Sequence, residues 1–302
     1  MPGRVVVCGN VVFDILVRKV EDPIRWAATT LIEEVSQQLG GNGSTTSYTI
    51  GKLGVPVTIV TLLGRDTAGD AVLARLRSAA VDLSLVQYVN AATSTAICLI
   101  RGNGERALLY QLGAASEDFS PFELPEGATH FHLAAVYRMR HLRQTGPALM
   151  ERAKRAGLRT SLDTQWDTEG EWMKVLAPSL PWTDYTLVNE DEARMLTGHS
   201  EPAAAARTLR DAGATNVVIK LGARGSWVNG AEIPGFCVQA VDSTGAGDCF
   251  AGAFIAALER EFSPEAAARF GNAVGALSVQ QIGATAGVLD WRATEQWISA
   301  HS

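Results

Sequence analysis

A glycine turn followed by an acidic residue is the stretch of this chain best suited to chemistry. Residues 242–254 read DSTGAGDCFAGAF, a loop that continues into a helix expected over residues 249–258. Backbone N–H groups at such a helix start lack intrahelical partners and, with the helix dipole, favour an anion such as phosphate. Asp248 lies at the mouth of this site, where a carboxylate is suited to taking a proton from a hydroxyl group that attacks the phosphate. The alternative is an ordinary helix start whose aspartate only complements the dipole.

This stretch resembles the second signature of the ribokinase, or phosphofructokinase-B type (pfkB), carbohydrate kinases, whose core reads Asp-Thr-x-Gly-Ala-Gly-Asp. The resemblance implies that the amides of Gly245, Ala246 and Gly247 form an anion hole and that Asp248 is the catalytic base. It also implies ATP as the phosphate donor, Mg²⁺ as its counter-ion and an alcohol group of a small sugar as the acceptor.

The composition sets the class of protein. The chain has 302 residues, 47% of them apolar and 19% charged, with a net charge of −6. These values are typical of a globular protein with one large α/β domain or two small ones, and the negative charge argues against a nucleic-acid partner. There is no signal-peptide layout, no run near the ~20 apolar residues of a membrane span, and no paired spacing of the four cysteines. We therefore expect a cytoplasmic protein that binds neither nucleic acid nor a membrane.

Asp14 lies in an apolar run, residues 11–17, just after a buried strand expected over residues 5–8. A lone carboxylate in such a run is unfavourable unless it has a partner or a task. It is either a strand-end residue hydrogen-bonded to a turn or part of a binding site. The resemblance implies the second role, because the family uses an aspartate at this distance from the first strand to hold the hydroxyl groups of the sugar.

A second glycine loop, residues 39–44, precedes a helix expected over residues 45–53. The loop fits neither a Walker A motif nor a dinucleotide fingerprint, but it is similar to the first signature of the same family. The resemblance places Gly40, Gly41 and Asn42 beside the substrate. Thr45 stands where the family usually has an asparagine that touches the sugar, so this position bears on which sugar is bound.

Asn189 follows a buried strand expected over residues 185–188 and can cap the next helix, with Glu192 in the first turn of that helix. The family has an Asn-x-x-Glu motif at this place that is linked to Mg²⁺ and the phosphates. By this resemblance Asn189 contacts the nucleotide and Glu192 acts indirectly on the metal. The same two residues can fill both the structural and the functional role.

Lys220 belongs to another buried strand, residues 217–221, which leads into a glycine turn with Gly222 and Gly225. Taken alone this turn is a plain hairpin, whereas the resemblance makes it the nucleotide-side loop. Asp163 ends an earlier strand and is a further candidate for ligand contact, because ligands bind at the strand ends of parallel sheets.

A last helix is expected to begin at residues 263–265, to contain Asn272 and to end at Gly283. By resemblance Asn272 lies beside the adenine, and the other nucleotide-side positions are Thr244, Gly245 and Gly247. The resemblance also has Asp242, Thr244 and Gly283 hold a K⁺ ion, as many relatives do.

Two runs with alternating apolar residues, 95–101 and 106–112, flank the turn Gly102-Asn103-Gly104-Glu105 and indicate a β-hairpin. Together with residues 11–18 and 34–39 it can form a small separate sheet. This hairpin is either a surface decoration or, as the resemblance implies, part of a lid over the sugar that joins two subunits in several members.

Alternating strands and helices with continuous apolar strands predict a mostly parallel sheet covered on both faces. We expect one ribokinase-like domain over residues 1–302, with a three-layer α/β/α core and the small β lid. The predicted activity is ATP-dependent phosphorylation of a small sugar. A nucleoside kinase of the same family remains open, with Trp26, Tyr48 or Tyr137 as a platform for the base, and so does a sugar sensor without catalysis.

Overall fold

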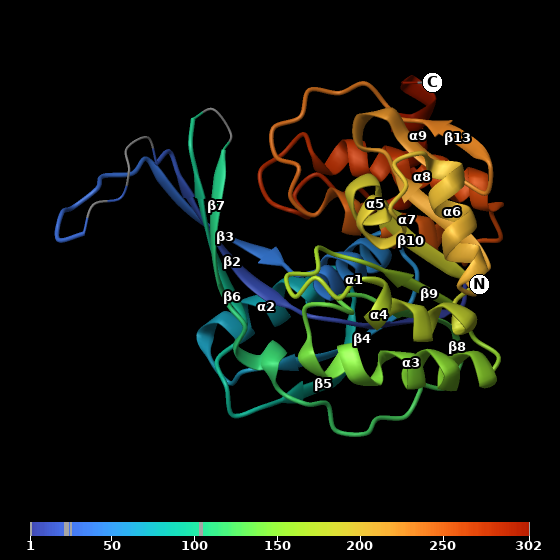
Figure 1. The fold of residues 1–302 in the computed structure, drawn as a ribbon. Helices are drawn as coiled ribbons and strands as arrows, with labels where there is room; N and C mark the ends of the chain where they lie inside the picture. Colours follow the sequence, from blue (N-terminus) through green and yellow to red (C-terminus); the bar gives the residue numbers. More distant parts are fainter. Residues whose placement is uncertain (1, 21–23, 25, 103–104, 302) are drawn as a thin grey trace.

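The strands of this computed structural model form two β-sheets. The structure describes residues 2–20, 24, 26–102 and 105–301. The larger sheet carries the core of the molecule (Figure 1). Its strands, from one edge to the other, are β13 (Ala231–Pro234), β12 (Gly225–Val228), β11 (Asn216–Lys220), β10 (Tyr185–Asn189), β9 (Arg159–Asp163), β8 (Ala128–Leu133), β1 (Arg4–Cys8), β4 (Val57–Leu63) and β5 (Asp82–Tyr88).

The strands from β5 to β11 run parallel, while β12 and β13 pair antiparallel at one edge. Continuous apolar runs explain this arrangement, because a parallel strand covered by helices on both faces can expose none of its side chains. All seven residues of β4 are buried. The mostly parallel sheet predicted from the sequence is therefore confirmed.

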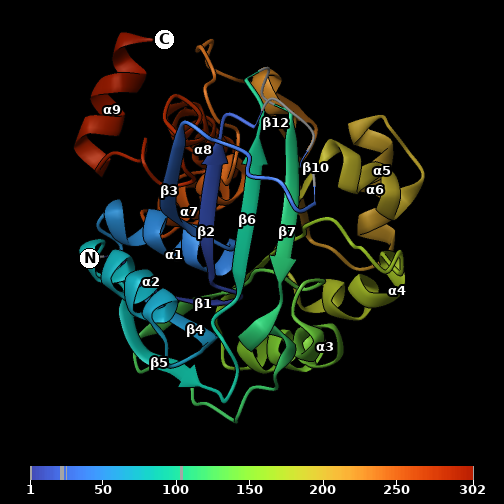
Figure 2. The same cartoon turned by 90° about the vertical axis from the view of Figure 1, so that its left-hand side faces the viewer.

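Helices cover both faces of this sheet (Figures 1 and 2). They are α1 (Asn42–Lys52), α2 (Thr67–Ser78), α3 (Arg140–Arg155), α4 (Met173–Leu176), α5 (Glu190–Thr197), α6 (Pro202–Asp211), α7 (Ala246–Leu258), α8 (Pro264–Ser278) and α9 (Trp291–Ala300), with short 3₁₀ turns η1 (Gly113–Ser116), η2 (Ala177–Trp182) and η3 (Gly222–Arg224). The residues of β1 alternate between two apolar clusters, since Val5 and Val7 pack with α1, α2, α7 and α8, whereas Val6 and Cys8 pack with α3, α5 and α6. The three-layer α/β/α core is thus confirmed.

The smaller sheet stands beside the core (Figures 1 and 2). In order across the sheet its strands are β3 (Glu34–Gly40), β2 (Val12–Arg18), β6 (Thr95–Ile100) and β7 (Arg106–Gln111). Strands β2 and β6 pair parallel, and the other two pairs are antiparallel. The four segments expected to form a small sheet do so. Residues 103–104, the centre of the predicted hairpin turn, lie outside the described residues.

Helix boundaries differ from the sequence-based expectation at three places near the glycine loops. Helix α1 begins at residue 42 instead of 45, α7 begins at residue 246 instead of 249, and α8 ends at residue 278 well before Gly283. At the start of α1 a tertiary contact overrides local propensity. Gly43 packs so closely on Gly9 that an added Cβ would lie 2.7 Å from its carbonyl carbon, so a glycine-rich stretch that reads as a loop is held in the helix.

Helices α1 and α7 pack directly on each other at small side chains. A Cβ added at Gly252 of α7 would lie 2.8 Å from both the Thr46 carbonyl oxygen and the Thr49 Cβ of α1. Ser47 and Thr49 donate their hydroxyls to carbonyl groups one turn back in α1, which removes the need for other partners in the core. This contact sets the distance between the N-termini of the two helices.

No helix among the described residues is long and apolar enough to cross a membrane.

We expect Gly252→Ala to lower the free energy of unfolding by up to about 2 kcal/mol, because overpacking destabilises by about 1–3 kcal/mol and better helix propensity offsets about 1 kcal/mol of that. The measurement is urea unfolding. Gly275→Ala in α8 is the matched control, since its Cβ would lie 3.6 Å or more from other atoms. The control should be neutral or stabilising, and equal behaviour of the two variants would contradict the close packing of α1 on α7.

Candidate active site

The first turn of α7 supplies backbone N–H groups at the centre of the molecule. The N-cap Gly245 has φ of 71°, in the left-handed region that glycine adopts without strain. The residues from Cys249 onward are buried, so only the N-terminal turn of this apolar helix reaches the surface of the site. Gly245, Ala246 and Gly247, the residues predicted to form an anion hole, belong to this start of α7.

Asp248 lies in this first turn and is held by a side chain from α1. The Asn42 amide nitrogen donates to Asp248 Oδ1 over 2.8 Å. Asn42 is itself positioned by Asn10, whose Oδ1 accepts from the Asn42 backbone N–H over 3.1 Å. Burial raises the pKa of Asp248 above its usual range, while the Lys220 ammonium and the Asn42 hydrogen bond oppose this shift. The carboxylate is thus oriented, partly buried and more basic than a surface aspartate.

Asp14 projects from β2 across Gly40 of β3. A Cβ at position 40 would lie 2.1 Å from Asp14 Oδ2, so only glycine leaves room for this carboxylate. Burial, and then the nearby negative charge of Asp242, raises the pKa of Asp14 to about 7. An aspartate that is half-buried without a cation partner is poised to accept hydrogen bonds from a ligand.

Thr45 lies in the first turn of α1 with only 1% of its surface exposed. Its hydroxyl has no hydrogen-bond partner among the described residues. Its methyl group faces the anion hole, because a Cβ added at Gly245 would lie 3.4 Å from Thr45 Cγ2. This residue therefore borders the anion hole, with a buried hydroxyl left for a ligand or water.

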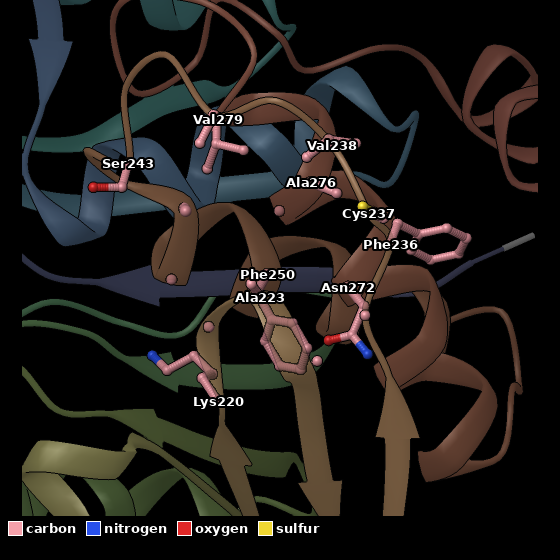
Figure 3. Close-up of a pocket in the computed structure, with 17 residues that line it drawn as sticks. Lys220, Ala223, Phe236, Cys237, Val238, Ser243, Phe250, Asn272, Ala276 and Val279 are labelled. Atoms are coloured by element: carbon pink, nitrogen blue, oxygen red, sulfur yellow. The ribbon is translucent and has the colours of Figure 1, made fainter. Parts of the chain in front are cut away.

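A cavity of about 460 Å³ opens next to the first turn of α7 (Figure 3). Figure 3 shows the apolar side chains Val238 and Val279 across the cavity from Lys220. Of the positions predicted to bind the nucleotide, those that line it are Lys220, Gly222, Gly225, Gly247 and Asn272. Asn189, Thr244 and Gly245 are not part of the lining. The cavity combines apolar walls with a cation beside an anion hole, as a flat ring attached to a phosphate chain requires.

Asn272 faces this cavity but its amide nitrogen is already in use. It donates to the carbonyl oxygens of Ile233 and Pro234 in β13, over 3.0 and 3.2 Å. Asn272 therefore fixes α8 to the edge of the sheet and shapes the wall of the cavity.

Lys220, at the end of β11, forms an ion pair with Asp163 at the end of β9. The ammonium nitrogen lies 2.6 Å from Asp163 Oδ1 and 2.9 Å from Oδ2. It also lies 3.3 Å from the position of a Cβ on Gly247, beside the anion hole. Burial alone would lower the pKa of Lys220, but Asp163 and Glu192 outweigh it and keep the pKa above its ordinary value. The lysine therefore brings a fixed positive charge to the phosphate site.

Asn189 and Glu192 form a complete capping box at the start of α5. Asn189 Oδ1 accepts from the Glu192 N–H over 2.8 Å, and Glu192 Oε2 accepts from the Asn189 N–H over 3.0 Å. The Thr164 hydroxyl donates to the same Oε2 over 2.8 Å. Burial raises the pKa of Glu192. The helix-capping role that the sequence left open is therefore present, and it occupies the Oε2 atom of Glu192.

Asp242 and its neighbours gather around an arginine from the small sheet. Asp242 Oδ1 accepts from the Thr244 N–H over 2.9 Å and from Arg106 Nη2 over 2.8 Å, while Oδ2 accepts from the Gly283 N–H over 2.9 Å. Arg106 Nη1 also donates to the Thr244 hydroxyl. Burial would raise the pKa of Asp242, but the hydrogen bonds from Gly283 and Thr244 and the Arg106 charge lower it below its usual value. The three residues expected to hold K⁺ do meet, but this set does not fit K⁺ because the Arg106 guanidinium is bonded to Asp242 and to the Thr244 hydroxyl and already supplies the positive charge there.

Three residues at the site had no role in the sequence-based prediction. Asn10 lies beyond the strand expected over residues 5–8, and Arg106 and Tyr110 belong to the run 106–112 of the expected hairpin. Asn10 also donates to the Tyr110 hydroxyl over 3.3 Å, which links α1 to the small sheet. A polar residue two positions after the first buried strand is the one local signal that marks Asn10. Nothing local marks Arg106, because its partner is 136 residues away.

The arrangement can transfer an anionic group to an oxygen nucleophile. The first turn of α7 and Lys220 attract negative charge, and Asp248 can accept a proton on the side where Asn42 contacts it.

Comparison with known proteins identifies the family. Residues 4–292 match the model of the pfkB family carbohydrate kinases. Among curated relatives, the chain is 32% identical to the ribokinase of Mus musculus, covering 81% of this chain and 79% of that protein. It is 31% identical to the ATP-dependent ribose-1-phosphate kinase of Halopiger xanaduensis, covering 93% of both chains.

Solved structures agree with this result. Arabidopsis thaliana ribokinase in complex with ribose and ATP superimposes with a TM-score of 0.85 at 25% identity, covering 99% of both chains. An E. coli protein assigned as a ribokinase II, in complex with ATP and Mg²⁺, also has a TM-score of 0.85 at 25% identity and covers 99% of this chain and 100% of its own. The family match spans both glycine loops and nearly the whole chain, so the protein belongs to the pfkB family of carbohydrate kinases.

Proposed function

We propose that this kinase transfers the γ-phosphate of ATP to a hydroxyl group of a small sugar, with Asp248 as the general base. The observation that carries the proposal is the position of Asp248 in the first turn of α7. That turn borders the nucleotide cavity on one side and meets Asn42 on the other. Phosphoryl transfer requires both substrates to meet at one anion-stabilising point, and this turn is the place where the two sides join.

The proposed mechanism assigns each side chain a task. Asp14 accepts hydrogen bonds from hydroxyl groups of the sugar and fixes its orientation. Asp248 accepts the proton of the attacking hydroxyl, a task for which its raised pKa suits it. The amides of residues 245–247 and the Lys220 ammonium stabilise the charge on the transferred phosphoryl group. Asn42 keeps the Asp248 carboxylate pointed at the acceptor.

Mg²⁺ would neutralise the phosphate charges in this reaction, as it accompanies ATP in the E. coli neighbour. Among the described residues no three His, Cys, Asp or Glu side chains lie close enough together to hold a metal ion. Glu192 fits an indirect role, because its Oε2 is committed to Asn189 and Thr164. We therefore assign Glu192 to the water shell of the metal, with the phosphates as its main ligands.

A sugar acceptor is favoured over a nucleoside by the positions of three aromatic residues. A nucleoside kinase needs an aromatic platform for the base. Tyr48 is 4% exposed and belongs to the apolar core, and Tyr137, also 4% exposed, belongs to the opposite core cluster. Trp26 is 97% exposed in the segment between β2 and β3. An ADP-release assay with neutral sugars, sugar phosphates, keto-deoxy acids and nucleosides would decide the acceptor.

The small sheet is proposed to act as a lid of the single kinase domain. It contributes Asp14 to the acceptor side, and Arg106 connects its β7 strand to the loop before α7. A cytoplasmic location stays a prediction from the sequence.

Asp248→Asn should lower kcat at least ~10²-fold, because loss of a general base typically has this effect. Binding of ATP, measured by calorimetry, should persist because Lys220 and the α7 amides remain. Asp290→Asn is the matched control, since Asp290 caps α9 by accepting from the Ala293 N–H and has no role at the site. A variant that keeps more than about a tenth of wild-type kcat would remove Asp248 from the role of base.

Asp14→Asn should lower kcat/KM for the sugar by about 10²-fold, since each hydroxyl left without its acceptor costs roughly 1–3 kcal/mol. KM for ATP should hardly change. In the wild type, kcat/KM for the sugar should fall as the pH drops below about 7, because the carboxyl group then becomes protonated. Glu34→Gln at the far end of β3 is the control and should change neither constant.

The thermal stability of Asp14→Asn distinguishes a ligand-binding role of Asp14 from a structural one. The pKa of Asp14 is about 7 in the folded protein and 3.8 in the reference state, so the folded chain loses stability as the pH rises through this window. Asp14→Asn removes this unfavourable charge. Its Tm at pH 8 should therefore equal or exceed that of the wild type, whereas a clearly lower Tm would indicate a structural role.

A homodimer through the lid is proposed from the apolar residues that its edge strands expose. They are Val35 of β3, Leu108 and Leu109 of β7, and the adjoining Leu112, each at least 44% exposed. We expect a dimer in sedimentation velocity and a monomer for Leu108→Lys with Leu109→Lys. Leu31→Lys, outside the sheet and also exposed, is the control. A monomeric wild type would contradict the proposal.

A further inference from the structure

We infer that the guanidinium of Arg106 is the built-in cation of the loop that leads into α7, in the place where a monovalent ion would otherwise bind. Arg106 is then a positioning residue for phosphoryl transfer, and the reaction does not depend on K⁺. The inference rests on the kinase activity proposed above and concerns what holds the anion hole in shape.

The first support is the set of donors around Asp242. This carboxylate is 5% exposed, and its two oxygens receive the N–H groups of Thr244 and Gly283 and the Nη2 of Arg106. A buried carboxylate needs a positive partner to compensate for its lost hydration. Arg106 supplies that charge. A second cation at the same place would meet the repulsion of the guanidinium charge.

The second support is what these bonds connect. Asp242 and Thr244 lie directly before the anion hole, since Gly245 is the N-cap of α7. Gly283 belongs to the segment after α8, and the Asp242 N–H donates to the Val279 carbonyl at the end of that helix over 3.0 Å. The pair therefore joins the loop before α7 to the segment after α8. Any shift of Asp242 moves the amides that must stabilise the phosphoryl group.

The third support is the origin of the arginine. Arg106 is the first residue of β7 and pairs in register with Ile100 of β6, so it belongs to the small sheet. Its planar guanidinium bonds Asp242 through Nη2 and Thr244 through Nη1, which fixes its direction as well as its charge. A freely diffusing ion would order the loop whatever the position of the small sheet. A tethered arginine orders the loop only when the small sheet lies against the core.

An alternative is that this is a surface ion pair with little effect, as most exposed pairs are. Arg106 is 32% exposed, but its partner is 5% exposed and carries two backbone hydrogen bonds as well. Removal of the arginine would leave a nearly buried carboxylate without a counter-charge beside the anion hole. The two readings differ in how the protein responds to monovalent cations.

The experiment measures ADP release with ATP, Mg²⁺ and the best sugar acceptor in K⁺, Na⁺ and tetramethylammonium salts at constant ionic strength. The wild type should give the same rate in all three. Arg106→Ala should lose roughly tenfold to hundredfold in kcat/KM in tetramethylammonium, the loss expected for a charge-assisted hydrogen bond, and should regain a large part of it in K⁺. Its Tm should also rise when K⁺ replaces tetramethylammonium, a readout that does not require turnover.

Two control variants define the outcome. Arg106→Lys keeps a tethered charge without the two-point contact and should be intermediate in rate and insensitive to K⁺. Arg101→Ala removes the other arginine of the hairpin, which pairs with Glu105 at 2.7 Å, and should behave as the wild type. Absence of any kinase activity in the wild type would contradict the proposed function. An active wild type with an unexpected response to cations would contradict only the inference about Arg106.

The inference is overturned if K⁺ stimulates the wild type several-fold over tetramethylammonium. It is equally overturned if Arg106→Ala retains wild-type kinetics, or if its defect is the same in all three salts. The cation response of the wild type decides the question even if Arg106→Ala does not fold.

Discussion

The proposed phosphoryl transfer depends on holding a carboxylate and a phosphate at the positive end of one helix. Like charges repel, and the first turn of α7 must attract the phosphoryl group while keeping Asp248 within reach of it. Three contacts reconcile these demands. Asn42 holds the Asp248 carboxylate, Lys220 places an ammonium beside Gly247, and Ala246 and Gly247 of the turn line the cavity. Each contact comes from a different element, so the large sheet and its helices serve as a frame that brings them together.

Buried charge is distributed unevenly over this frame. Asp163 and Asp242 have cationic partners, Lys220 and Arg106, at 2.6 and 2.8 Å. Asp14 and Asp248 have no ion-pair partner among the described residues, and burial raises the pKa of both. Buried carboxylates of this kind reduce stability, and residues of this kind concentrate at functional sites because binding or catalysis compensates for them. The paired acids therefore shape the site, and the unpaired acids are the ones assigned to chemistry.

Small residues explain how so many polar groups fit into a compact core. Glycine at position 40 leaves room for the Asp14 carboxylate, and glycine at position 252 lets α7 approach α1. The serine and threonine side chains of α1 return their hydrogen bonds to their own helix, which allows a polar helix to be buried. Only the Thr45 hydroxyl of this helix is left buried without a partner in the described part of the chain, and it borders the anion hole.

The amino-acid sequence by itself determined the features that depend on neighbours along the chain. Apolar runs such as residues 57–63 marked the buried strands, Asn189 and Glu192 marked a capped helix, and the glycine turn before Asp248 marked the loop that leads into α7. Propensity, capping and turn geometry act over a few residues, which is why these features can be predicted locally. Only the tertiary structure decided the contacts between residues that are far apart in the sequence. Asn42 reaches Asp248 across 206 positions, Arg106 reaches Asp242 across 136, and Lys220 reaches Asp163 across 57. It also decided the start of α1, where Gly43 is packed against Gly9 within the helix despite the low helix propensity of glycine. No local pattern can encode these partners, since their meeting depends on how two sheets and nine described helices are placed in space.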